Sequence, residues 1–347
     1  MGTTVANPGQ TSDSGLVTHA TTIPRTPVLI AVDWGTTSLR AWLMGDGGRI
    51  LATRRHAKGS LSIAELPTNE RTAEHERIYL DVCGDWIHEN PQLPSIACGM
   101  VGSSEGWTDA GYLSVPTDLA VNGADLTEVH HRLGSVHLVP GLRIASRRDA
   151  PGDVLRGEET QLIGVLDLVE HTDLPHTIVL PGTHTKWVQV DKREVISFTT
   201  VMTGEIFGLL IGHGLLARTA RPGRRDDSAY ARGLRTAADR GLPSELFGGR
   251  ALVLDGLLDA DSLPDYVSGV LIADEVRHRL PTCVNPQRIT LCGAPDLCRR
   301  YATALTECGA EPRIVTEEAT VRGLWVVAQR AGLVDPNRSI RQEATTL

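Results

Sequence analysis

Short apolar runs along the chain predict buried strands, and each run ends at a turn. Residues 28–32, 95–98, 136–139 and 177–180 are rich in apolar side chains, many of them branched, which is typical of strands inside a sheet. Glycine or Pro-Gly follows each run within a few residues. Loops are therefore expected at the strand ends, where binding and catalytic residues commonly lie.

The first and the last of these runs each continue into a strand–turn–strand unit. Residues 28–32 lead into the turn Asp-Trp-Gly-Thr-Thr-Ser (33–38) and a returning strand over 39–44. Residues 177–180 lead into Pro-Gly-Thr-His-Thr (181–185) and a returning strand over 186–190. The recurrence of this unit after about 150 residues predicts two related α/β halves that meet at a cleft.

Helical spacing of apolar residues accounts for much of the remaining chain. It predicts helices over residues 70–88, from 157 onward, and over 265–279, 295–308 and 320–331, with a short strand at 289–292. The Arg-rich stretch 218–228 is expected to be an exposed loop.

Composition narrows the class of protein. With 347 residues, two domains are expected, and the net charge of −8 argues against nucleic acid as the main partner. No apolar run approaches membrane-spanning length, so no membrane is expected as a partner. Residues 1–27 lack a secretory signal and predict a disordered tail. The six cysteines form no C-x-x-C pair, which favours reduced thiols and a cytoplasmic location.

The turn at residues 33–38 has the chemistry of a phosphate site. Gly35 allows close approach of the backbone, Thr36 and Thr37 add hydroxyl groups, and Asp33 is a candidate ligand for a metal ion or its water. An ordinary hairpin is the alternative interpretation of this turn.

A pair of carboxylates opens the helix that is predicted from residue 157. Glu158 and Glu159 are candidate general bases because they lie between the two strand–turn–strand units, although acidic residues in a first turn also complement the helix dipole. Arg156 and Lys186 flank them and are candidates for binding a substrate carboxylate or phosphate oxygens. A surface ion pair is the alternative for these two cations.

Two further turns are candidate contacts for small molecules. The Gly-rich loop 99–107 offers Gly102, Ser103 and Trp107 to a polyol, and an ordinary connection explains it equally well. Gly293 and Ala294 precede a predicted helix and leave room for a purine or a phosphate, although such β–α turns are common.

Three other patterns are rejected as functional signals. Residues 293–296 resemble the anion hole of ribokinase-like enzymes, but Pro295 removes the backbone donor that such a hole requires. Residues 212–217 match a dinucleotide fingerprint, but residues 203–216 look continuously helical, whereas the fingerprint should follow a strand and open a helix. His184 is assigned no catalytic role.

Taken together, several blocks resemble one family of sugar-acid kinases. They are Asp33–Thr37, CGMVGSSEGW (98–107), YLSVP (112–116), VPGL (139–142), LRGEETQLIG (155–164), LPGTHTKWV (180–188) and VMTGE (201–205). In this order they are similar to the 2-dehydro-3-deoxygalactonokinase family, over about residues 28–332. The resemblance implies the actin-like ATPase fold, with two ribonuclease-H-like domains and an interdomain cleft, expected at 28–176 and 177–347.

The resemblance also implies ATP and Mg²⁺ as cofactors and assigns roles by position. Asp33 with Gly35, Thr36 and Thr37 resembles the first phosphate motif and the metal site, and Gly182-Thr183 resembles the second phosphate motif. Gly293-Ala294 resembles the adenosine motif. The Gly-Glu-Glu block is similar to the block that holds the base in related sugar kinases, with Glu158 the first choice and Glu159 the second.

The expected activity is transfer of the ATP γ-phosphate to the 6-hydroxyl of 2-dehydro-3-deoxy-D-galactonate. The substrate residues would be Gly102, Ser103, Trp107, Arg156 and Lys186. The alternatives are a kinase for a related sugar acid or sugar and a non-catalytic ATP-binding regulator. A sugar acid is the expected partner, and a homodimer is left open.

Overall fold

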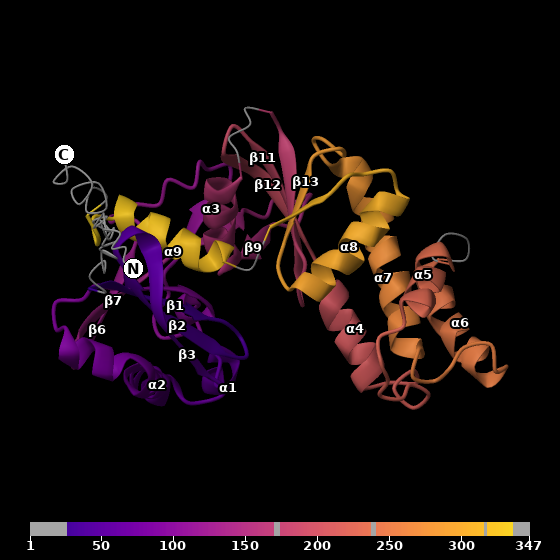
Figure 1. Cartoon of the computed structure of the whole chain (residues 1–347), viewed down its shortest axis with the longest axis horizontal. Helices are drawn as coiled ribbons and strands as arrows, with labels where there is room; N and C mark the ends of the chain where they lie inside the picture. Colours follow the sequence, from indigo (N-terminus) through magenta and orange to yellow (C-terminus); the bar gives the residue numbers. More distant parts are fainter. Residues whose placement is uncertain (1–25, 170–173, 237–240, 316–317, 336–347) are drawn as a thin grey trace, which may run out of the picture.

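The protein consists of two α/β lobes with the same strand order. The structure is a computed structural model that describes residues 26–169, 174–236, 241–315 and 318–335. The lobes lie side by side, and helices α3 and α9 lie between the first lobe and the sheet of the second (Figure 1). Residues 1–25 of the predicted tail lie outside the described residues, and residue 27 already belongs to the first strand.

The sheet of the first lobe has the order β3-β2-β1-β4-β7-β6. Antiparallel pairing joins β1 to β2 and β2 to β3, whereas β4 is parallel to β1 and β7 is parallel to β4. A three-stranded sheet, β5-β8-β9, lies beside it. The strands are β1 (Pro27–Trp34), β2 (Leu39–Gly45), β3 (Arg49–His56), β4 (Ser95–Gly99), β5 (Tyr112–Ser114), β6 (Thr127–His131), β7 (Gly134–Leu138), β8 (Gly141–Ile144) and β9 (Asp153–Leu155).

The sheet of the second lobe has the order β12-β11-β10-β13-β14. Its first three strands are antiparallel and its last two run parallel to β10, which repeats the pattern of β3-β2-β1-β4-β7. This repeat confirms the predicted pair of ribonuclease-H-like lobes. The strands are β10 (His176–Leu180), β11 (Thr185–Asp191), β12 (Glu194–Val201), β13 (Ile289–Cys292) and β14 (Arg313–Val315).

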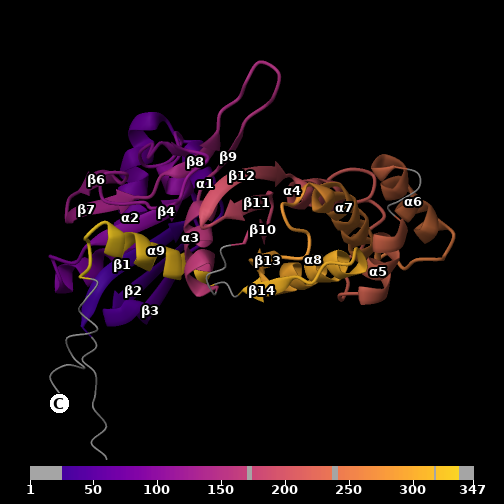
Figure 2. The same ribbon diagram turned by 90° about the horizontal axis from the view of Figure 1, so that it is seen from above.

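Helices cover the sheets, and those of the second lobe also extend it away from the first (Figure 2). Helix α2 packs on β2 and β3, and α7 contacts α4, α5, α6 and α8. Among the described residues, no helix combines the length and the apolar character needed to cross a bilayer. The helices are α1 (Ser60–Ala64), α2 (Thr68–Glu89), α3 (Glu158–Leu168), α4 (Thr203–Gly212), α5 (Asp227–Thr236), α6 (Leu242–Leu254), α7 (Leu263–Arg279), α8 (Pro295–Glu307) and α9 (Ala319–Arg330).

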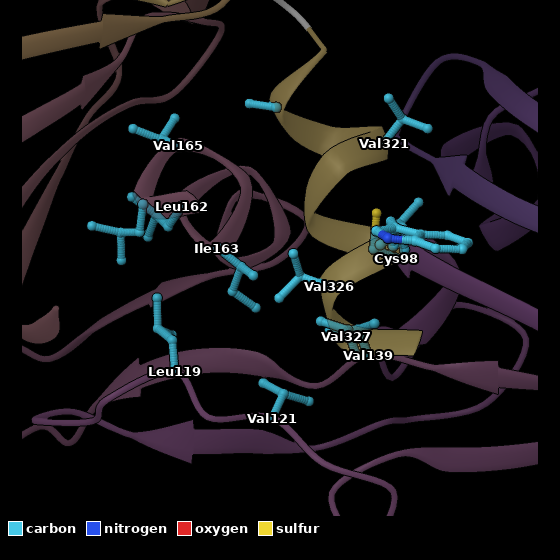
Figure 3. Close-up of a cluster of buried hydrophobic side chains, with 14 of the residues drawn as sticks. Cys98, Leu119, Val121, Val139, Leu162, Ile163, Val165, Val321, Val326 and Val327 are labelled. Carbon is cyan, nitrogen blue, oxygen red and sulfur yellow. The ribbon is translucent and has the colours of Figure 1, made fainter. Parts of the chain in front are cut away.

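One apolar core joins the two lobes. Alternate residues of β1 point to opposite faces, so that Leu29 and Ala31 belong to this core while Ile30 and Val32 face the core under α2. The shared core also includes Ile178 and residues of α3 and α9. Figure 3 shows Ile163 of α3 and Val326 of α9 within this cluster. The packing holds the strand ends of both lobes around one cleft.

Candidate active site

The central cleft is lined by both lobes and has a volume of about 450 Å³. Asp33, Gly35 and Thr36 line it from the first lobe, and Gly182 and Thr183 line it from the second. The two predicted phosphate turns therefore face one crevice, as the interpretation of the repeated unit requires. The other predicted residues that line it are Arg156, Glu158, Lys186 and Gly293.

The turn in the first lobe is fixed by the start of α1. The backbone N–H groups of Ser60 and Leu61 donate to the carbonyl oxygens of Gly35 and Thr36, at 3.0 and 3.1 Å. A Cβ atom at Gly59 would lie only 2.2 Å from the Thr36 oxygen, so glycine is required there. The start of α1 thus holds the turn through the carbonyl groups of Gly35 and Thr36.

The turn in the second lobe is held in the same way by the start of α4. The N–H of Glu205 donates to the carbonyl oxygen of Thr183 at 2.9 Å. A Cβ atom at Gly204 would lie 2.3 Å from the carbonyl oxygen of Gly182. The space above Gly182 itself is open, because a Cβ atom there would meet nothing within 4 Å. Glycine at 182 therefore leaves room for a ligand rather than for the protein's own packing.

The two glutamates at the start of α3 have different surroundings. Glu158 lines the cleft, with 26% of its side chain exposed, and it accepts the N–H of Arg156 at 3.1 Å. Glu159 is fully buried and accepts hydrogen bonds from the Gly157 N–H at 2.6 Å and the Thr160 hydroxyl at 2.9 Å. Glu158 is thus the carboxylate that a substrate in the cleft could reach.

Burial governs the protonation of both carboxyl groups. It raises the pKa of Glu158, partly offset by the charges of Lys186 and His184. Burial, together with the charge of Glu158, raises the pKa of Glu159 to about 8. The Lys186 ammonium lies 3.7 Å from a Glu158 oxygen and is itself buried. The cleft therefore holds a carboxylate whose pKa is raised toward neutrality beside a fixed cation, a combination suited to a general base.

Arg156 lines the cleft, but its side chain is only 4% exposed and is held by the protein. Its Nη2 donates to the carbonyl oxygen of Gly111 at 2.8 Å, and the group stacks on the Tyr112 ring at 4.3 Å. Nε and Nη1 are buried and have no hydrogen-bond partner in the described structure. A Cβ atom at Gly102 would lie 3.1 Å from Nη1, so Gly102 leaves space for the guanidinium group.

A second cavity of about 450 Å³ adjoins the cleft at Gly182 and Thr183, which line both. Its other walls come from α4, α7 and α8 and are largely apolar. They include Phe207, Leu271, Ile272, Leu297 and Tyr301. Gly293 lines the cleft instead, and Ala294, which precedes the first turn of α8, lines neither cavity.

Some predicted residues lie away from the cleft. Trp107 is 4% exposed and packs with Trp34, His75, Tyr79 and His131 in the core of the first lobe. Its side chain therefore anchors the loop 99–107 to the core and does not contact a ligand in the cleft. Ser103 is also buried, and Thr37, exposed at the turn tip, is not among the lining residues.

The structure adds cleft residues that sequence reasoning missed. His184 lines the cleft, and its Nε2 lies 2.5 Å from a carboxylate oxygen of Glu205. Gln161 and Thr320 also line it, and the Thr320 hydroxyl is buried without a partner in the described structure. Glu205 belongs to the VMTGE block and His184 to the second phosphate turn, but only the fold reveals that these two blocks are in contact.

Comparison with known proteins identifies the family. The sequence model of a family described as 2-keto-3-deoxy-galactonokinase matches residues 33–327. A protein of Escherichia coli (strain K12) named 2-dehydro-3-deoxygalactonokinase is 36% identical over 81% of this chain and 90% of its own. A solved structure from Sinorhizobium meliloti, described as a candidate 2-dehydro-3-deoxygalactonokinase, is 33% identical, with a TM-score of 0.75 over 87% of this chain and 98% of its own. This chain therefore belongs to the 2-keto-3-deoxy-galactonokinase family.

Proposed function

We propose that this protein transfers the γ-phosphoryl group of ATP to the 6-hydroxyl of 2-dehydro-3-deoxy-D-galactonate. The observation that carries the proposal is the cleft itself, where Glu158 and Lys186 lie together with the two phosphate turns. Arg156 lines the same cleft, and a guanidinium group forms strong hydrogen bonds with a carboxylate. A sugar acid supplies that carboxylate.

Glu158 serves as the base in this proposal. It faces the cleft beside Lys186, and it would accept the proton of the 6-hydroxyl as the bond from O6 to the γ-phosphorus forms. The bond from that phosphorus to the bridging oxygen breaks, and ADP leaves. Lys186 would stabilise the negative charge of the groups that react beside Glu158, because its buried ammonium group is held 3.7 Å from a Glu158 oxygen.

The nucleotide would lie across the second lobe. The apolar cavity beside α4, α7 and α8 suits a purine, and Gly182-Thr183 connects it to the cleft, where the phosphates would lie. Asp33 would hold Mg²⁺, because Arg40 bonds only its Oδ2 atom, at 2.8 Å, and Oδ1 has no hydrogen-bond partner in the described structure. When bound, Mg²⁺ would neutralise charge on the β- and γ-phosphates.

We also infer a cytoplasmic enzyme that acts on a small molecule. The described residues contain six free cysteines, five of them buried, which is typical of a reducing compartment.

A coupled assay of ADP release tests the proposal. The purified protein with Mg²⁺-ATP should release ADP when 2-dehydro-3-deoxy-D-galactonate is added, and mass spectrometry should detect its 6-phosphate. Galactose, which lacks the carboxylate, is the control for the role of Arg156, and 2-dehydro-3-deoxy-D-gluconate tests the stereochemistry. ADP release that is independent of the galactonate acid, or stronger with either control compound, would contradict the proposed substrate.

A further inference from the structure

His184 lines the cleft and is in contact with Glu205, and neither residue belongs to the proposed proton transfer to Glu158. His184 follows Thr183 in the second phosphate turn, and Glu205 belongs to the first turn of α4. The imidazole Nε2 and the carboxylate oxygen are 2.5 Å apart, so the two groups are in hydrogen-bond contact. Both side chains are partly exposed, at 46% and 38%. The pair can therefore contact a bound ligand.

The hydrogen bond fixes which ring nitrogen is available. Nε2 donates its hydrogen to Glu205, as in other carboxylate–histidine pairs, so Nδ1 is the atom left for a ligand. Nδ1 has no hydrogen-bond partner in the described structure. In the doubly protonated ring, Nδ1 is a donor whose hydrogen bond a phosphoryl oxygen can accept.

The surroundings of His184 indicate which part of the substrates it meets. It follows Thr183 of the phosphate turn, and it lines the same cleft as Glu158, the proposed base. A group close to both the phosphate turn and the base is close to the phosphoryl group in transit. Arg156 lies on the first lobe, where its guanidinium group is bonded to Gly111. We therefore assign the carboxylate end of the acid to Arg156 and the phosphoryl end to His184.

We propose that His184, positioned by Glu205, binds the transferring phosphoryl group through Nδ1 and stabilises its charge in the transition state. This inference rests on the proposed kinase function. The charged groups around the pair are Asp33, Arg156, Glu158 and Lys186, all of which line the same cleft. His184 would then be a catalytic residue and Glu205 a positioning residue.

Steady-state kinetics of three variants test the inference. His184→Gln removes the ring and its charge, and Glu205→Gln keeps a hydrogen-bond acceptor but removes the charge that holds the ring. His213→Gln is the matched control, because His213 is an exposed histidine at the end of α4 that lines neither cavity. Melting temperatures confirm that all three variants fold.

The expected result is a fall in kcat of about 100-fold for His184→Gln, with smaller changes in KM, because one preorganised donor is lost. Glu205→Gln should lower kcat by a smaller factor, again with little change in KM, because the ring stays but is held less firmly. His213→Gln should match the wild type in both parameters.

Three results would overturn the inference. One is a kcat for His184→Gln within twofold of the wild type, and another is a kcat for Glu205→Gln equal to that of the wild type. The third is a loss confined to the KM for the acid, which would place His184 at the sugar instead. Failure of the proposed function is separate from all three, because it would appear as wild-type protein that does not phosphorylate the acid.

Discussion

Glu158 and Glu159 are adjacent in sequence, but only Glu158 lines the cleft. Glu158→Gln should lower kcat by about 10²- to 10⁴-fold, because the hydroxyl proton then has no acceptor. Glu159→Gln is the matched control and should keep most of the activity, since its amide can still accept from the Gly157 N–H and donate to the Thr160 hydroxyl. The ADP-release assay measures both variants. Equal losses in the two would show that the base cannot be assigned to Glu158 alone.

The same pair of residues leads to a prediction about pH and stability. Burial raises the pKa of Glu159 from 4.5 to about 8, so the folded protein retains a proton that the unfolded chain releases. Stability should therefore decrease as the pH rises from about 5 to about 8. The Glu159→Gln variant has no ionising group at this position. Its free energy of unfolding, measured in urea, should therefore rise relative to that of the wild type between pH 5.5 and pH 8. Parallel pH profiles for the two proteins would contradict this prediction.

Residue patterns in the sequence predicted which residues line the cleft better than how those residues are oriented. Asp33, Glu158, Arg156 and Lys186 were predictable as cleft residues because they lie near strand ends and have side-chain types that suit phosphoryl transfer. The choice between Glu158 and Glu159 depends on the direction in which α3 begins, which the sequence does not encode locally. Trp107 was predicted as a ligand contact, but the loop turns its ring into the core, where the rings of Trp34, His75, Tyr79 and His131 contact it.

At the scale of elements, each phosphate turn depends on the start of a following helix. Gly204→Ala would place a Cβ atom 2.3 Å from the carbonyl oxygen of Gly182, so α4 must shift away from the turn. We expect the KM for ATP to rise at least tenfold, to about 100-fold, because a displacement of about 1 Å in a positioning group has effects of that order.

Gly208→Ala is the control on the same helix. A Cβ atom at Gly208 would meet nothing within 4 Å, so this substitution should leave the KM unchanged and stabilise α4 by up to about 1 kcal/mol. Steady-state kinetics and thermal melting measure the two effects. An unchanged KM in Gly204→Ala would show that the start of α4 does not set the position of the turn.

Elements whose apolar residues recur with a clear period were predictable from the sequence, whereas short elements were not. The helix predicted over 70–88 is α2, and the helix predicted over 295–308 is α8, within two residues at each end. The small sheet β5-β8-β9 was missed, because its strands have three or four residues and no lasting alternation. The helix predicted over 265–279 is α7, but other helices contact it on several sides and bury most of its residues, which the apolar spacing alone does not indicate.

For the whole molecule, the repeated strand–turn–strand unit predicted the two lobes, and the structure shows how they are joined. Helix α9 lies at the end of the chain, yet it packs against α3 and β1 of the first lobe. A Cβ atom at Gly164 would lie 1.8 Å from the Ala319 oxygen, and one at Gly323 would lie 1.9 Å from the Thr160 oxygen. Two glycines thus allow the helices to touch backbone to backbone, a contact between distant segments that no local pattern contains.

This contact predicts that the lobes unfold together and that Gly323→Ala weakens their coupling. The added methyl group must push α9 away from Thr160, which opens the core that the lobes share and moves the start of α3, where Glu158 lies. Calorimetry should show one transition for the wild type, and a lower, broader or divided transition for Gly323→Ala, together with reduced kcat. Gly84→Ala in α2 is the control, since its nearest neighbour would lie 3.9 Å away. If Gly323→Ala melts like the wild type, α3 and α9 do not join the lobes, and the cleft must be held together by other contacts.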